Sequence, residues 1–263
     1  MIPIALTIAG SDPSGGAGIQ ADLKTFSALK VYGMSVITAL TAQNTIGVSG
    51  LLEVNPAFVA DQLDAVLSDI VPGAAKTGML ANAAIVEIVA TKIRQYGVVK
   101  LVVDPVMIST SGSTLLADDA IDALSRLLLP LAQIVMPNID EARVLSRRDV
   151  RDVHDMEEAA RRIHGLGARY VYIKGGHLGG DAIDVLFDGV TSTRLHGSRI
   201  VTDNTHGTGC ILSAAMAANL ALGLSVPEAV VRAKDFVTLA IRNSLRLGAG
   251  SGPCDPLGIE PRE

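Results

Sequence analysis

Short apolar runs alternate with segments of helical periodicity along nearly the whole chain. Six runs have the length and composition of buried strands: residues 4–8, 35–40, 74–77, 101–103, 134–136 and 170–173. Apolar residues spaced three or four apart predict helices between them, at 19–29, 58–70, 85–93, 121–128 and 156–166. Strands that alternate with helices favour a mostly parallel sheet with helices on both faces. We therefore predict a three-layer α/β/α fold.

The chain after residue 173 departs from this alternation. Asp188-Gly189, between Phe187 and Val190, is typical of a type I′ hairpin turn, which predicts an antiparallel pair at one edge of the sheet. Two apolar helices are expected at 210–222 and 227–247. The polar stretch 147–155 is expected to be a surface connection.

Composition indicates one globular domain. Of the 263 residues, 49% are apolar and 19% are charged, which is enough apolar material for a large core without metals or disulfides. No Pro/Ser-rich linker or low-complexity tract divides the chain. We expect residues 1–263 to form a single domain.

Charge and cysteine usage exclude several partners. A net charge of −5, with four Tyr, four Phe and no Trp, argues against nucleic-acid binding. The apolar stretch 210–226 is interrupted by polar residues and is shorter than a membrane span, and residues 1–9 lack the basic start of a secretion signal. The two cysteines, Cys210 and Cys254, fit a reducing compartment. We expect a cytoplasmic protein without a membrane or nucleic-acid partner.

Polar residues follow three of the predicted strands, where parallel sheets bind their ligands. They are Asp104, Asn138 and Lys174. Asn138 and Glu141 have the spacing of a helix capping box, and the same two side chains could face a magnesium-bound phosphate. Spacing leaves both interpretations open. Asp104 could equally be a turn residue, and Lys174 a solvated strand end.

A glycine-rich loop at residues 10–18 follows the first predicted strand. Residues 16–21 resemble a dinucleotide-binding fingerprint, but no Asp or Glu occurs between Val31 and Leu52 to bind a ribose. The GxxxxGK[ST] phosphate loop is absent. A tight strand-to-helix turn and a close backbone approach to a small planar ligand both stay possible.

A second glycine-rich segment leads into the helix expected at 210–222. The backbone amides of Thr208, Gly209 and Cys210 at a helix start can surround an anion such as a phosphate in transfer. The same position favours the Cys210 thiolate, although a small buried cysteine that packs the helix is the alternative. His177 and His206 are expected to be structural or surface residues, and without a metal-ligand spacing around them we predict no zinc site.

Together these segments resemble the hydroxymethylpyrimidine/phosphomethylpyrimidine kinases of thiamine biosynthesis, within the ribokinase-like superfamily. The matching segments run in order along the chain: residues 6–26, 36–45, 76–80, 104–107, 137–138, 174–177 and 205–210. The resemblance implies the ribokinase-like fold. It also implies that ATP phosphorylates 4-amino-5-hydroxymethyl-2-methylpyrimidine, and that the monophosphate is then phosphorylated to the pyrophosphate.

The resemblance further implies roles for individual residues. Gln43 would hydrogen-bond the pyrimidine, and four residues would line its pocket: Gly10, Asp22, Met79 and Val106. An anion hole would come from Gly207, Thr208, Gly209 and Cys210, with Cys210 as a candidate general base. Asp104 and Glu141 match the magnesium region, and three residues match the nucleotide side: Lys174, Asn138 and Thr202. ATP and Mg²⁺ would be the cofactors.

Two other functions stay possible at this point. A pyridoxal or pyridoxine kinase of the same fold would share the Cys-type anion hole and a planar heterocycle with a hydroxymethyl arm. A non-catalytic pyrimidine-binding sensor would not need the anion hole. The superfamily often forms dimers, so we expect a homodimer. Ser251 stands where the tail of the family often has His.

Overall fold

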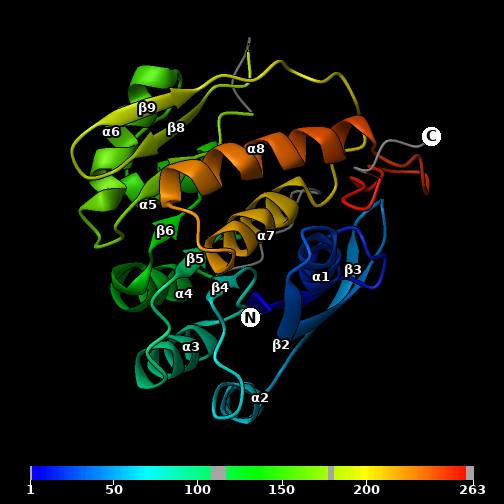
Figure 1. Cartoon of the computed structure of the whole chain (residues 1–263), viewed down its shortest axis with the longest axis vertical. Coiled ribbons are helices and arrows are strands. Elements are labelled where there is room, and N and C mark those ends of the chain that lie inside the picture. Colours follow the sequence, from blue (N-terminus) through cyan, green and yellow to red (C-terminus); the bar gives the residue numbers. More distant parts are fainter. Residues whose placement is uncertain (1, 108–116, 177–180, 259–263) are drawn as a thin grey trace.

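One continuous sheet runs through the described part of the chain, which covers residues 2–107, 117–176 and 181–258 of the computed structural model. Its strands lie in the order β3-β2-β1-β4-β5-β6-β7-β8-β9 (Figure 1). Their bounds are β1 Ile4–Ser11, β2 Tyr32–Gln43, β3 Val48–Glu53, β4 Ala74–Thr77, β5 Leu101–Val103, β6 Ile134–Val135, β7 Val171–Ile173, β8 Asp184–Phe187 and β9 Ser192–Leu195. The central pairs are parallel, whereas β3 pairs antiparallel with β2 at one edge and β7, β8 and β9 pair antiparallel at the other.

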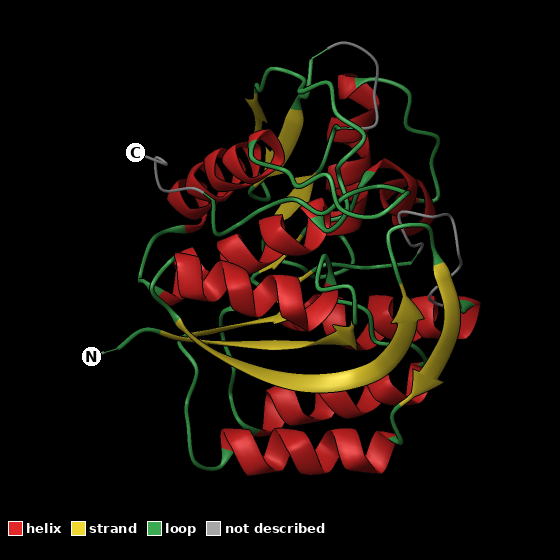
Figure 2. Cartoon of the chain, turned by 90° about the vertical axis from the view of Figure 1, so that its right-hand side faces the viewer, coloured by secondary structure: helices red, strands yellow, loops and turns green. Residues whose placement is uncertain are grey.

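Helices cover both faces of this sheet (Figure 2). One face carries α1 Gly18–Ala28, α7 Thr208–Ala221 and α8 Val226–Arg242. The other carries α2 Pro56–Leu67, α3 Ala83–Gln95, α4 Asp118–Ala123, α5 Ile139–Ser146 and α6 Val153–His164. A π turn at Leu124–Leu128 and a 3₁₀ turn at Leu129–Leu131 follow α4, where Pro130 ends the helix. The predicted three-layer architecture with an antiparallel edge is therefore confirmed.

The core consists of two apolar layers, one on each face of the sheet. Side chains alternate between the faces of a strand, so Leu6 and Ile8 of β1 pack toward α2 and α3, and Ala5 packs toward α7. Because both faces are covered, the parallel strands read as continuous apolar runs rather than as alternating ones. Helix α7 is buried on all sides from Ile211 to Leu220, between the sheet and α1 and α8.

Several sequence predictions need correction. Strand β3 was not predicted, because most of its residues are exposed and it carries no apolar run. The hairpin of β8 and β9 exists, but its turn is not type I′, which requires two residues with positive φ. Only Gly189 has one in this turn, at 98°. Instead, the Asp188 carboxylate accepts hydrogen bonds from the amides of Val190 and Thr191, which closes a longer loop.

Two element boundaries also differ from the prediction. Helix α8 ends at Arg242 rather than at residue 247. The polar connection expected at 147–155 is shorter, because α6 already begins at Val153. The Asp152 side chain accepts from the Asp155 amide at 2.9 Å and so caps that helix. No helix among the described residues is long and apolar enough to cross a membrane.

A substitution on α2 tests the packing of the layer that faces β2. Leu63 is fully buried there, so Leu63→Ala is expected to lower the free energy of unfolding by about 2–5 kcal/mol. Asp61→Ala, on the exposed side of the same helix, is the matched control and is expected to change it by less than about 0.5 kcal/mol. Urea unfolding curves measure both values. Equal effects of the two substitutions would contradict this packing.

Candidate functional site

The carboxyl ends of the central parallel strands meet at one edge of the sheet, where they place the polar residues predicted from the sequence. Asp104 follows β5, Asn138 follows β6 and Lys174 follows β7. The Lys174 amide donates to the Pro137 carbonyl at 2.9 Å, and the Asp104 amide donates to the Thr77 carbonyl at 3.0 Å. The sheet ladder thus extends slightly beyond the strands and fixes the backbone from which these side chains project.

A buried cluster of charges occupies this edge. The Lys174 Nζ lies 2.8 Å from Asp104 Oδ1 and 3.9 Å from Glu141 Oε2. The hydroxyl of Ser213 on α7 donates to the other Asp104 oxygen at 3.0 Å. Asp104 and Glu141 are only 2% and 4% exposed. We call Asp104, Glu141 and Lys174 the charge cluster, and it holds two carboxylates against one ammonium.

The surroundings of Glu141 favour its protonated form. Burial raises the pKa of Glu141 to about 7, against the opposing charge of Lys174 and with the support of the nearby Asp104 carboxylate. Burial works against the charge of Lys174, but Asp104 and Glu141 raise the pKa of this ammonium above its usual range. Glu141 is therefore divided between its acid and carboxylate forms at neutral pH, and a bound cation would favour the carboxylate.

Magnesium suits this cluster only in part. Carboxylate oxygens are its preferred protein ligands, and a cation would relieve the excess negative charge. Within the residues that the structure describes, however, no three or more His, Cys, Asp and Glu side chains gather to hold a metal. Asp104 and Glu141 could supply two carboxylates at most, so phosphate oxygens and water would have to complete the coordination.

Asn138 and Glu141 form the capping box that their spacing suggested. The Asn138 side chain accepts from the Glu141 amide at 2.9 Å, and Glu141 Oε2 accepts from the Asn138 amide at 2.8 Å. The same Glu141 oxygen faces Lys174. The two interpretations left open by the sequence are therefore compatible for Glu141, which caps α5 and belongs to the charge cluster.

The start of α7 lies directly over the charge cluster. A Cβ added at Gly209 would lie 3.6 Å from Lys174 Nζ and 3.8 Å from Asp104 Oδ2. Among the described residues no hydrogen bond occupies the amides of Gly209 and Cys210, so both can face an anion. The prediction is wrong for the third amide, because Thr208 donates to the Thr205 carbonyl at 3.2 Å.

Gly207 caps α7 and permits its close contact with the first glycine-rich loop. Its φ is 83°, which disfavours any residue with a side chain. A Cβ at this position would also lie 1.8 Å from the Gly16 carbonyl oxygen. The two glycine-rich segments therefore touch backbone to backbone, and only glycine fits between them.

Cys210 lies in the first turn of α7, where the sequence predicted a thiolate. Burial raises the pKa of the Cys210 thiol to about 11. The Lys76 ammonium and a hydrogen bond from the Gly18 amide act in the opposite direction, while the carboxylates of Asp22 and Asp104 add to the rise. In the free protein, burial therefore opposes the thiolate that the helix start was predicted to favour.

A second buried pair lies below Cys210. Lys76 Nζ donates to both Asp22 oxygens at 2.9 and 3.0 Å, and the Thr7 hydroxyl donates to one of them at 2.6 Å. Burial raises the pKa of Asp22, but these three donated hydrogen bonds favour its carboxylate, and we assign an ion pair. Asp22 is fully buried and its carboxylate is bound to Lys76 and Thr7, so its contact with the substrate, carried over from the resemblance, stays a prediction.

No role was predicted for Lys76 from the sequence. The signal was present, because a lysine inside the apolar strand predicted at 74–77 must find a buried partner. The partner could not be identified from the sequence, because Asp22 is 54 residues away. Ser213, whose hydroxyl contacts Asp104, gave no signal at all among the small residues of its helix.

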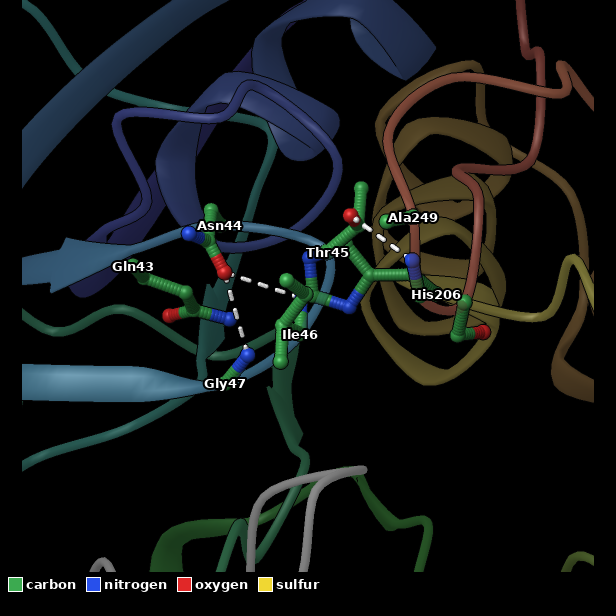
Figure 3. Close-up of a pocket in the computed structure, with 9 residues that line it drawn as sticks. Gln43, Asn44, Thr45, Ile46, Gly47, His206 and Ala249 are labelled. Carbon is green, nitrogen blue, oxygen red and sulfur yellow. Dashed lines mark hydrogen bonds between the residues drawn. The ribbon is translucent and has the colours of Figure 1, made fainter.

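Gln43 lines a cavity of about 330 Å³ at the end of β2 (Figure 3). The cavity lies between the turn of residues 43–47 and the tail of residues 249–251, with His206 in its wall. The Gln43 side-chain oxygen accepts from the Thr41 hydroxyl at 3.2 Å. Its amide nitrogen has no hydrogen bond to any described residue, which leaves it available to a ligand.

The other residues predicted for the site differ in their surroundings. Gly10 packs on Met79, since a Cβ at Gly10 would lie 3.3 Å from the Met79 sulfur. Val106 follows Asp104 and packs against the core. Thr202 accepts from the Asn204 amide at 3.2 Å, and no hydrogen bond among the described residues joins it to the charge cluster. His177 lies outside the described residues.

Alkylation of Cys210 tests its protonation. In a Cys254→Ser background, the rate of reaction with iodoacetamide is expected to stay below that of free cysteine at pH 7.5, because only the thiolate reacts. The rate is expected to rise about tenfold per pH unit up to pH 9, since the pKa of Cys210 is raised to about 11. Mass spectrometry measures the rate, with Cys210→Ala as control. A plateau below pH 8 would contradict the raised pKa.

Comparisons with known proteins show what this chain is similar to. A model of the phosphomethylpyrimidine kinase family matches residues 12–255. The chain is 51% identical to the hydroxymethylpyrimidine/phosphomethylpyrimidine kinase of Synechococcus elongatus, over 96% of both proteins. It is 53% identical over 94% of its length to the thiamine biosynthesis bifunctional protein ThiED of Geobacter sulfurreducens, of which it spans 51%.

A solved structure supports the fold as well. The pyridoxal kinase of Staphylococcus aureus, in complex with AMP-PCP and pyridoxal, superimposes with a TM-score of 0.92 at 37% identity. The match covers 100% of this chain and 96% of that one. Because the family model matches most of the chain and the Synechococcus elongatus kinase is 51% identical over 96% of both proteins, the chain belongs to the phosphomethylpyrimidine kinase family.

Proposed function

We propose that this chain transfers the γ-phosphate of ATP to the hydroxymethyl group of 4-amino-5-hydroxymethyl-2-methylpyrimidine, and then a second phosphate to that monophosphate, in thiamine biosynthesis. The observation that carries the proposal is the start of α7 above the charge cluster, with Lys174 close to Gly209. This arrangement suits a transferring phosphate, which needs positioning and charge neutralisation more than covalent chemistry. The name of the Synechococcus elongatus relative supports the pyrimidine as acceptor, and that of the Geobacter sulfurreducens relative supports thiamine biosynthesis.

ATP is the proposed phosphate donor, with Mg²⁺ as its ion. The AMP-PCP complex of the Staphylococcus aureus kinase supports an ATP-type donor. Lys174, Asn138 and Thr202 are proposed for the nucleotide side, and Asp104 and Glu141 would hold Mg²⁺ together with phosphate oxygens. When bound, Mg²⁺ would neutralise part of the phosphate charge and add the positive charge that the cluster lacks.

The acceptor oxygen attacks the γ-phosphorus, a new P–O bond forms, the bond to the β-phosphate oxygen breaks and ADP leaves, while the proton of the acceptor hydroxyl passes to solvent. The amides of Gly209 and Cys210 are proposed to receive the charge on the transferring group, and Lys174 to balance it. Gln43 would bind the pyrimidine edge, and Gly10, Met79 and Val106 would surround the ring. Gly207 would hold the start of α7 in the conformation that places these two amides against the phosphate.

Cys210 is proposed to orient the acceptor oxygen rather than to act as a ready base. With its pKa raised to about 11, it carries its proton at neutral pH in the free protein. In a loose transition state the acceptor hydroxyl releases its proton late, so strong base catalysis is not required. The transfer of the second phosphate needs base catalysis even less, because the oxygens of the monophosphate are largely deprotonated above about pH 6.

A pyridoxal kinase activity is the second candidate. The observation that favours it is the TM-score of 0.92 with the Staphylococcus aureus pyridoxal kinase. The identity of 37% to that protein is lower than the 51% to the pyrimidine kinase of Synechococcus elongatus, which ranks the pyrimidine first. A non-catalytic sensor is ranked last, because it would not need unpaired amides over a charge cluster.

We further propose that residues 1–263 act as one domain in a cytoplasmic homodimer, with small molecules as the only other partners. The use of ATP and the two unpaired cysteines fit the cytoplasm. The edge formed by β2 and β3 carries the exposed side chains of Leu40, Leu51 and Leu52, which a second copy would cover.

Steady-state kinetics with three acceptors test this function. The purified protein, with ATP and Mg²⁺, is expected to phosphorylate the pyrimidine alcohol and its monophosphate. We expect kcat/KM for the pyrimidine alcohol to exceed that for pyridoxine at least about tenfold, because a buried polar edge without its partner costs about 1–3 kcal/mol. A preference for pyridoxine would support the second candidate. Binding of the pyrimidine without turnover would support the sensor.

A further inference from the structure

A buried histidine–aspartate pair joins the two glycine-rich loops of the site. His206 Nε2 lies 2.8 Å from Asp12 Oδ2, although the residues are 194 positions apart in the sequence. His206 is 6% exposed and Asp12 is 3% exposed. Neither side chain is among the groups proposed to bind the phosphate or the pyrimidine. We call the two residues the loop clasp.

Asp12 organises the first loop through its side chain. One carboxylate oxygen accepts from the Ser14 amide at 2.9 Å. The other accepts from the Ser14 hydroxyl and the Ala17 amide, both at 2.9 Å, in addition to its contact with His206. The carboxylate therefore folds residues 12–17 around itself. Among the side-chain hydrogen bonds of Asp12 to described residues, only the contact with His206 reaches beyond this loop.

Two hydrogen bonds to the tail hold the backbone of His206. Its amide donates to the Gly252 carbonyl and its carbonyl accepts from the Cys254 amide, both at 3.1 Å. Its ring packs so closely on the first loop that a Cβ at Gly16 would lie 2.4 Å from His206 Cδ2. The ring also lies in the wall of the cavity that Gln43 lines (Figure 3). His206 therefore connects the first loop, the start of α7 and the tail.

The two joined loops carry opposite sides of the proposed reaction. The first loop supplies Gly10 to the acceptor side and the Gly18 amide to the Cys210 sulfur. The second supplies the amides of Gly209 and Cys210 to the phosphate side. A misplacement of about 1 Å between reacting groups can cost a rate factor of about a hundred.

We infer that His206 is a positioning residue for phosphate transfer, which acts through Asp12 to fix the acceptor loop against the phosphate-binding start of α7. The inference rests on the proposed function. It requires the Nε2 hydrogen bond to Asp12 rather than a particular charge on the ring. A side chain that replaces this donor should therefore restore the activity, whereas one that only fills space should not.

Three variants test the loop clasp. His206→Ala removes the bond, and His206→Gln offers an amide nitrogen near the position of Nε2. His164→Ala is the matched control, because His164 makes an edge contact with Phe187 on the α6 side of the sheet and takes no part in the site. For each variant we measure kcat and KM for the pyrimidine alcohol at saturating ATP, together with the melting temperature.

We expect His206→Ala to lower kcat at least about tenfold, since the loops lose their fixed separation, and His206→Gln to recover most of this loss. His164→Ala is expected to lower the melting temperature while kcat stays within about twofold of the original value. The inference is overturned if His206→Ala keeps kcat within twofold in a folded protein, or if His206→Gln is as slow as His206→Ala.

A further variant keeps the test decisive if His206→Ala does not fold. His206→Asn keeps a polar side chain that is too short to reach Asp12. It is expected to be slow where His206→Gln is active, and equal rates for the two would overturn the inference. An inactive wild-type protein would instead refute the proposed function, so the two failures are distinguishable.

Discussion

The contact of Lys174 with Asp104 and Glu141 is the constraint on which the site depends. Charges that are this deeply buried are tolerated only when their partners are correctly placed. The partners come from the ends of β5 and β7 and from the capped start of α5, so the sheet and its register must be complete before the charges can pair. The fold thus gathers two carboxylates and one ammonium at the edge where we propose that a phosphate binds, and a bound cation would offset the excess of carboxylate.

Two glycines allow the start of α7 to lie at this edge of the sheet. Gly207 touches the backbone of Gly16, and α7 can therefore begin directly above Lys174. The helix is apolar and buried on all sides, so its position is set by packing and not by the ligand. The amides of Gly209 and Cys210 at its start have no hydrogen bond to a described residue and are proposed to bind the phosphate, while the contact of Asp12 with His206 joins that start to the proposed acceptor loop. The apolar packing of α7 therefore fixes the positions of the polar groups at its start.

Much of this could be predicted from sequence because it depends on local patterns. The alternation of elements, the polar residues after the strands and the capping box of Asn138 all follow from short-range rules. The missed features depend on contacts between distant residues. Lys76 on β4 pairs with Asp22 on α1, and the Thr208 amide donates to the Thr205 carbonyl. Burial raises the pKa of Cys210, whereas the helix start alone would lower it. Strand β3 was missed because its residues are mostly exposed.

The central claim is that the charge cluster is the centre of phosphate transfer, and Asp104→Asn tests it most directly. This substitution keeps the size of the side chain and removes the charge that pairs with Lys174. The account predicts a fall in kcat of about a hundredfold or more, in a protein that circular dichroism finds folded. Asp64→Asn, which breaks the surface pair with Lys92, is the control and should leave kcat unchanged. A kcat of Asp104→Asn within threefold of the original value would contradict the account.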